Sequence, residues 1–156
     1  MAEVIHIKPH HFLDIITRFG AGQGFEPHPY GHAQHIVAAR ILRDPQITLE
    51  LTLGCDDICA PCRHQQGGKC LDSTATTGQT LSKEAYNRAL DERWLARLGL
   101  RAGERLTAAE FCRLARERLG DIYKLYPDAP REGTALRRER LLRGAALYLG
   151  EIKEEE

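Results

Sequence analysis

The alternation of polar and apolar residues predicts two strands. Residues 3–7 alternate just before Pro9, which indicates a short edge strand. Residues 46–53 alternate more clearly, with a polar residue between successive apolar ones, so we expect a strand that is buried on one face only. Its apolar positions are Ile47, Leu49, Leu51 and Leu53.

Helical spacing of apolar residues recurs in five other segments. Thr107 and Glu110 form a capping box that predicts the start of the fourth helix, and Gly99 should end the third. The sequence therefore predicts an α+β fold, mostly helical, with about five helices, a small two-stranded sheet and a cysteine-rich metal loop. The expected helices cover residues 10–19, 33–43, 82–98, 107–122 and about 134–152, and residues 72–80 should form a loop.

Composition narrows the class of protein. The chain has 156 residues, of which 42% are apolar and 28% charged, so we expect a single globular domain over residues 1–156. The 22 basic and 22 acidic side chains cancel, so no nucleic acid or anionic membrane surface is expected as a partner. Long apolar runs and a secretory signal are missing, which places the protein in the cytoplasm by expectation.

Four of the five cysteines lie in a loop at residues 54–72, which we predict to bind a metal. Their spacing is C-x3-C-x2-C-x7-C, and Gly67-Gly68 allows the reversal that brings the last cysteine back. A tetrahedral zinc, an iron–sulphur cluster and a thioredoxin-like pair all fit this spacing. The thioredoxin-like pair requires a helix that starts at the first cysteine of the central C-x2-C, and the residues after this motif make a poor helix. The predicted ligands are Cys55, Cys59, Cys62 and Cys70.

Spacing alone does not separate zinc from an iron–sulphur cluster. The first three cysteines also match the C-x3-C-x2-C of radical enzymes that use S-adenosylmethionine, but this chain is too short for their repeated strand–helix units. Four thiolates leave either centre anionic, and nearby only Arg63 and Lys69 compensate. We therefore expect Asp56 and Asp57 to accept backbone N–H groups in a turn.

Histidines supply the other candidate chemistry. His10 and His11 begin the first predicted helix, where one should cap or pack and the other face solvent. In a functional role they would donate hydrogen bonds to the sulphurs of a cluster, or form a site with Asp14 one turn further on. We interpret His28, His32 and His35 as a solvated helix start, and Cys112 as a buried structural thiol.

Several blocks resemble a family of small bacterial and archaeal proteins of unknown function. The resemblance covers roughly residues 5–115 and implies an iron–sulphur cluster. Where that family usually has a cysteine this chain has Asp14, and where it usually has a proline this chain has Cys55. If both positions face the same centre, the resemblance implies that a ligand has moved from the first helix to the loop and that the count of four is kept. The family's further cysteine pair and Trp near the C-terminus are missing. The matching blocks are Pro9–Leu13, Gly54, Asp56–Cys62, Cys70, Asp91, Leu98–Leu100 and Gly103–Glu104.

These observations converge on a metal-binding protein. We expect an iron–sulphur cluster, of 4Fe-4S type by preference, that serves electron transfer or redox sensing with a redox or protein partner. The first alternative is a structural zinc site in an interaction module. A further alternative is a metal-dependent enzyme that uses His10, His11 and Asp14.

Overall fold

The fold is α+β, as predicted. The structure is a computed structural model, which describes residues 4–25, 33–53, 56–58, 65–66, 69–70, 73–74, 81–127 and 129–152. The helices of this part of the chain are α1 Pro9–Gly20, α2 Gln34–Arg43, α3 Lys83–Leu98, α4 Ala108–Glu117, α5 Ile122–Leu125 and α6 Arg131–Tyr148. The strands are β1 Val4–Ile7, β2 Thr48–Leu51, β3 Gln65–Gln66, β4 Lys69–Cys70, β5 Ser73–Thr74, β6 Leu81–Ser82 and β7 Arg105–Thr107.

The main sheet has three strands rather than the expected two, in the order β1-β2-β7. Strand β1 runs parallel to β2, with Ile5 opposite Leu49, and β7 runs antiparallel to β2, with Leu106 opposite Leu49. The prediction missed β7 because three residues are too few to show an alternating pattern. Both predicted strands are confirmed, and β1 lies at an edge of the sheet as expected.

The described residues contain six helices against about five expected, because the helix predicted over 107–122 ends early and a separate short helix begins at Ile122. Thr107 caps α4 as predicted, since its Oγ1 accepts a hydrogen bond from the Glu110 amide at 3.1 Å. Helix α4 ends at Glu117, and Asp121 caps the short α5 by accepting from the Tyr123 amide at 2.9 Å. The last helix begins and ends about four residues earlier than expected, and Gly99 does end α3 with a positive φ of 71°.

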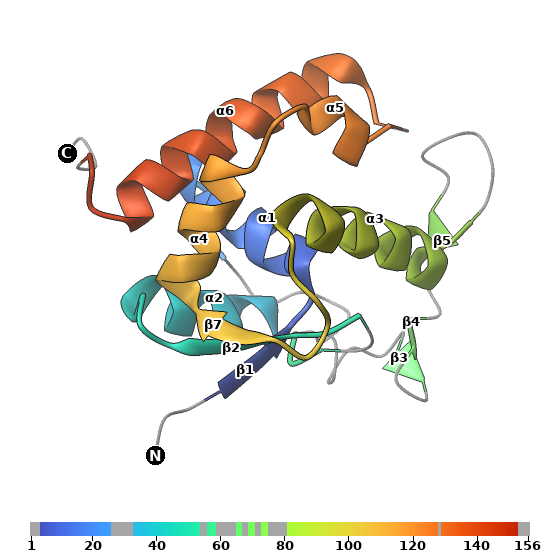
Figure 1. Cartoon of the computed structure of the whole chain (residues 1–156), viewed down its shortest axis with the longest axis horizontal. Coiled ribbons are helices and arrows are strands. Elements are labelled where there is room, and N and C mark those ends of the chain that lie inside the picture. The colour runs from blue at the N-terminus through green and yellow to red at the C-terminus, as the bar shows by residue number, and fades with distance from the viewer. Residues whose placement is uncertain are drawn as a thin grey trace.

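Helix α1 lies at the centre of the fold, and its neighbours are α6, α3 and α4 (Figure 1). The contact with α6 depends on two glycines. A Cβ atom on Gly144 would lie 1.9 Å from the Ile16 carbonyl oxygen, and one on Gly20 would lie 1.9 Å from the Arg140 carbonyl oxygen. The two helices therefore approach backbone to backbone, which holds α1 firmly against the longest helix of the described chain.

Two small ribbons lie between β2 and α3 in the sequence. Strands β3 and β4 pair antiparallel, with Gln66 opposite Lys69. Gly67 and Gly68, which the sequence predicts to allow the reversal, lie outside the described residues. Strands β5 and β6 also pair antiparallel, which corrects the prediction that residues 72–80 form only a loop: Ser73 and Thr74 are strand residues. Within the described residues, no helix is both long enough and apolar enough to span a membrane.

Candidate functional site

The start of α1 is built from Lys8, Pro9 and the two histidines. Lys8 has an extended conformation, as a residue before proline should, and Pro9 occupies the first turn, where its missing N–H costs nothing. The amides of His11 and Phe12 donate to the Lys8 carbonyl oxygen at 3.0 and 3.3 Å. Lys8 provides no side-chain cap, so the next free amide is satisfied by a residue from another helix.

That residue is Asp91, from α3. Its Oδ1 accepts from the His10 amide at 2.7 Å, and its two oxygens lie 2.8 and 3.0 Å from His10 Nδ1. Asp91 is completely buried, so the carboxylate has no water to replace these contacts. A negative charge at this position also suits the positive end of the α1 dipole. Asp91 therefore fixes both the helix start and the orientation of the His10 ring.

Asp56 holds His11 in the same way, from the cysteine segment. Its Oδ2 lies 2.6 Å from His11 Nδ1 and accepts from the Lys8 amide at 2.7 Å, while its Oδ1 accepts from the Ile58 amide at 3.1 Å. Asp56 is only 2% exposed. The prediction that Asp56 caps a turn is confirmed, but its longer-range contacts to Lys8 and His11 were not expected. Asp56 therefore fastens the chain immediately after Cys55 to the start of α1.

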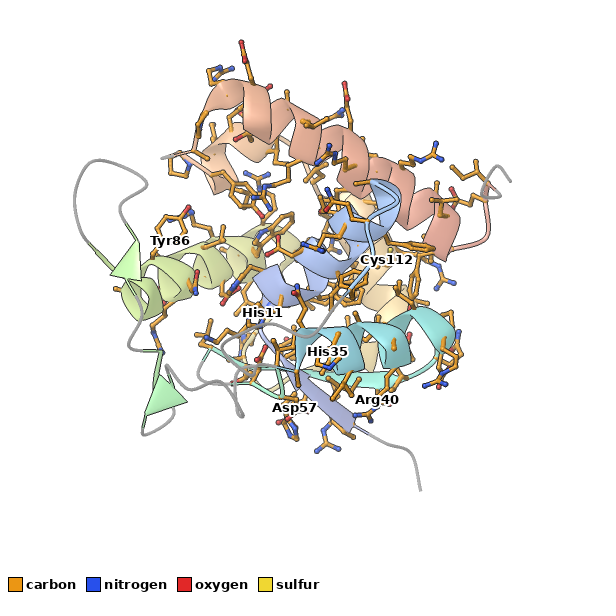
Figure 2. The ribbon with its side chains drawn as sticks, turned by 180° about the vertical axis from the view of Figure 1, so that it is seen from behind. His11, His35, Arg40, Asp57, Tyr86 and Cys112 are labelled. Atoms are coloured by element: carbon orange, nitrogen blue, oxygen red, sulfur yellow. The ribbon has the colours of Figure 1, made fainter. Side chains whose placement is uncertain are left out.

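Asp57 makes a second connection to the sheet. Its Oδ2 accepts from the His6 amide at 2.9 Å, and its own amide donates to the His6 carbonyl oxygen at 3.0 Å. These bonds satisfy the backbone N–H and C=O groups of His6 on the edge of β1 that faces away from β2. Figure 2 shows Asp57 beside β1 and His11 on α1. The predicted role of Asp57 as an acceptor of a backbone N–H is thus confirmed, although the amide belongs to a strand.

The two histidine rings lie together, with centroids 4.3 Å apart and planes tilted by 52°. Their side chains are 8% and 18% exposed, so the expectation that one of them faces solvent was wrong. Both rings use Nδ1 to contact a carboxylate, which leaves each Nε2 directed away from that carboxylate. Among the residues that the structure describes, neither Nε2 has a hydrogen-bond partner. This is the arrangement by which carboxylates orient histidines toward a metal or an acceptor.

Charge at the site favours a protonated His11. Burial lowers the pKa of His11, but the charge of Asp56, its hydrogen bond and the charge of Asp14 together raise the pKa above its usual value. Lys8, which is only 2% exposed, opposes this shift. In the protonated form both ring nitrogens donate, so Nε2 of His11 becomes a charge-assisted donor.

Asp14 does not join the histidines in a three-residue metal group. Its Oδ1 lies 2.8 Å from the Arg137 guanidinium of α6, and no group of three His, Cys, Asp or Glu side chains suited to a metal ion occurs among the described residues. Arg137 also stacks over the Tyr126 ring at 4.5 Å. The alternative with His10, His11 and Asp14 as the ligands of an ion therefore gains no geometric support.

The predicted thiol ligands fall largely outside the described residues. Cys55, Cys59 and Cys62 lie there, as do His28 and His32, and for Cys70 the structure gives only its backbone in β4. Cys112 is buried on α4, away from His11 in Figure 2, and burial raises the pKa of its thiol to about 12. The prediction of a buried structural thiol is confirmed. His35 is the second residue of α2, and its Nδ1 is buried without a partner among the described residues.

Sequence reasoning missed the roles of Asp91 and Lys8. The signal for Asp91 was present, since Asp91, Trp94, Leu95 and Leu98 share one face of a helix and the other three are apolar. A carboxylate on an apolar face must find a buried partner. Nothing local to Lys8 indicated its burial, and the carboxylate that accepts from its amide, Asp56, lies 48 residues further along the chain.

Comparison with protein families places this fold and site in context. Residues 24–125 match a family described as "Protein of unknown function (DUF1284)", so the match includes the cysteine segment, Asp56 and Asp91 but not His10 and His11. Neither the curated proteins nor the solved structures that were compared include a match. Since the matched segment is well over half of the chain, the protein belongs to this family of proteins of unknown function, DUF1284.

Proposed function

We propose that this protein holds an iron–sulphur cluster through Cys55, Cys59, Cys62 and Cys70, and that the cluster serves electron transfer or redox sensing. The observation that carries the proposal is the position of Asp56. This carboxylate adjoins the first cysteine in the chain and is hydrogen-bonded to His11 at 2.6 Å. The start of the cysteine segment is thereby joined to a pair of oriented, mostly buried histidines.

The residues around this junction suit an anionic centre. A cluster with four thiolate ligands carries net negative charge, and donors to its sulphurs stabilise it and shift its reduction potential. Lys8 is buried here, His11 is mostly buried, and the pKa of His11 is raised, which favours its protonated form. The oxygens of Asp56 and Asp91 contact N–H groups of Lys8, His10, His11 and Ile58. These donors compensate the negative charge of the two carboxylates, so it opposes an anionic centre less.

In this proposal each residue of the junction has a separate task. A cluster, when bound, supplies one-electron transfer. Asp91 orients His10, and Asp56 orients His11 and keeps a proton on its ring. The Nε2 of His11 would be available as a hydrogen-bond donor to the centre, and Lys8 would add positive charge within the same region.

Purification without oxygen, followed by an absorption spectrum and by iron, zinc and sulphide analysis, tests the proposal. Brown protein with iron and acid-labile sulphide is the expected result. Colourless protein that contains neither metal nor sulphide after anaerobic reconstitution contradicts it. Cys55→Ser should lower the iron content, whereas Cys112→Ser, which changes a cysteine on α4, should leave it unchanged. Full iron content in the Cys55→Ser protein would refute Cys55 as a ligand.

A structural zinc site in an interaction module is the second candidate. The observation in its favour is the pair of carboxylate–histidine contacts, an arrangement that commonly surrounds protein-bound zinc. In that case the metal would close the cysteine loop, and the helical surface would bind a protein partner. One zinc per chain, no sulphide and a colourless protein would support this candidate over the cluster.

A further inference from the structure

A cleft of about 300 Å³ lies beside α1, and its lining residues come from α1, the turn after it, the first residue of α2, and α6. Polar side chains supply most of the lining. The residues that matter for its chemistry are Asp14, Thr17, Arg18, Arg137 and Arg140. Neither His10 nor His11 lines it, so the cleft is separate from the histidine pair.

The cleft gathers positive charge in a protein whose net charge is zero. Three arginines line it against one carboxylate, Asp14, so the local formal charge is 3 − 1 = +2. Asp14 neutralises Arg137, with an Oδ1 to guanidinium distance of 2.8 Å. Arg140 has no ion pair among the described residues. One guanidinium of the cleft is therefore compensated by a carboxylate, and a second remains without a counter-ion within the part of the chain described.

Arg18 is held in place but incompletely satisfied. One terminal nitrogen donates to the Gly24 carbonyl oxygen at 2.8 Å, and its guanidinium stacks over Phe25 at 5.1 Å. Its Nε is buried and has no hydrogen-bond partner among the described residues. A buried donor without an acceptor is costly, so the protein keeps this guanidinium in the lining of the cleft at a cost in free energy.

We propose that this cleft binds a small oxyanion, a molecule that carries a phosphate or carboxylate group, between Arg18 and Arg140. The planar guanidinium group offers parallel donors that match the oxygens of either group. The volume lies at the lower end of the range for ligand pockets, which suits a small molecule. Arg137 stays paired with Asp14 and forms the wall of the site. This inference stands independently of the metal proposed above.

Calorimetric titration of the whole protein with pyrophosphate and with succinate, each at ionic strength fixed with sodium chloride, tests the cleft. Arg140→Gln removes a charge from the cleft, and Arg138→Gln removes one from an exposed position on the same helix outside it. We expect saturable binding of at least one anion to the wild type and to Arg138→Gln, and at least about tenfold weaker binding to Arg140→Gln. The anion that binds identifies the class.

Two results would overturn the inference. One is the lack of saturable binding of either anion to the wild-type protein. The other is an equal loss of affinity in both variants, which would mean that the anions respond only to overall charge. Arg18→Gln provides a second test, because it should also weaken binding about tenfold or more. Thermal melts of all variants without anion establish that each is folded, and an Arg18→Gln protein with unchanged affinity would equally count against the site.

Discussion

Replacement of Asp56 by Asn tests whether this carboxylate joins the cysteine segment to α1. The substitution keeps the size and shape of the side chain but replaces one acceptor oxygen by a donor NH2 group. In the wild type both oxygens face N–H donors: the Lys8 amide at 2.7 Å and His11 Nδ1 at 2.6 Å on one side, the Ile58 amide at 3.1 Å on the other. Whichever way the new amide turns, a donor faces a donor in a buried place.

The expected cost follows from these contacts. The less harmful orientation leaves the Ile58 amide without an acceptor, which costs about 1–3 kcal/mol. The bonds from Lys8 and His11 remain but lose the carboxylate charge, and bonds to charged groups contribute roughly 1 kcal/mol more than neutral ones. With about 1 kcal/mol lost at each of these two bonds, we expect Asp56→Asn to lower the free energy of unfolding by about 3–5 kcal/mol.

Urea denaturation followed by circular dichroism measures this loss, with Asp57→Asn as the matched control. Asp57 is the neighbouring carboxylate, its side chain is 40% exposed, and its Oδ2 accepts the His6 amide, so its replacement should cost below about 1 kcal/mol. The proposal further predicts that Asp56→Asn lowers metal content and Asp57→Asn does not. A change below about 0.5 kcal/mol in Asp56→Asn, or equal losses in the two variants, would refute the reasoning.

Three further predictions concern packing, pH and thiol reactivity. Gly144→Ala should lower the free energy of unfolding by about 2 kcal/mol or more, because the new Cβ would lie 1.9 Å from the Ile16 carbonyl oxygen. Gly133→Ala on the same helix meets open space and should change stability by at most about 1 kcal/mol. Equal effects of the two substitutions in urea denaturation would contradict the close contact. Because the pKa of His11 is raised in the folded protein, its charged interaction is fully present below the unfolded pKa of about 6.5 and is lost as pH rises through the folded value. The difference in stability between wild type and His11→Gln should therefore be larger at pH 6 than at pH 9. A difference that does not change with pH would contradict the raised pKa. With a thiol pKa near 12, Cys112 should resist iodoacetamide at pH 8 in the folded protein and react once it is unfolded; comparison of wild type with Cys112→Ser identifies its signal, and rapid labelling of the native thiol would disprove its burial.

The elements with strong local signals were predictable from the sequence. Thr107 and Glu110 predicted the start of α4 correctly because a cap is formed by residues three positions apart. The alternation around Leu49 predicted β2, since one face of that strand is buried. By contrast, β7 is three residues long and exists because β2 offers it a partner, so its signal lies in the pairing rather than in its own residues.

Only part of the candidate site could be predicted, because contacts between residues far apart in the sequence form the rest. His10 and His11 attracted attention as adjacent histidines at a helix start, but their partners lie 81 and 45 residues away in the sequence. One sequence carries no direct information about which distant carboxylate meets which ring. The rise in the pKa of His11 occurs against the effect of burial and follows mainly from the contact with Asp56, so it could not be inferred beforehand.

The surroundings of His11 bear on positions 14 and 55, the two positions at which this chain differs from the family that it resembles. Asp14 stands one helical turn after His11, and its charge contributes to the raised pKa of that histidine. Cys55 adjoins Asp56, which contacts the same ring at 2.6 Å. Cys55 itself lies outside the described residues, but its neighbour Asp56 and Asp14 both act on the same His11 ring, although they are 42 residues apart (56 − 14). A ligand lost at one position and gained at the other can serve a single centre only if the two positions are neighbours in space. The proposed relocation therefore predicts that Cys55 is a ligand of the centre and that Asp14, which is engaged with Arg137, is not.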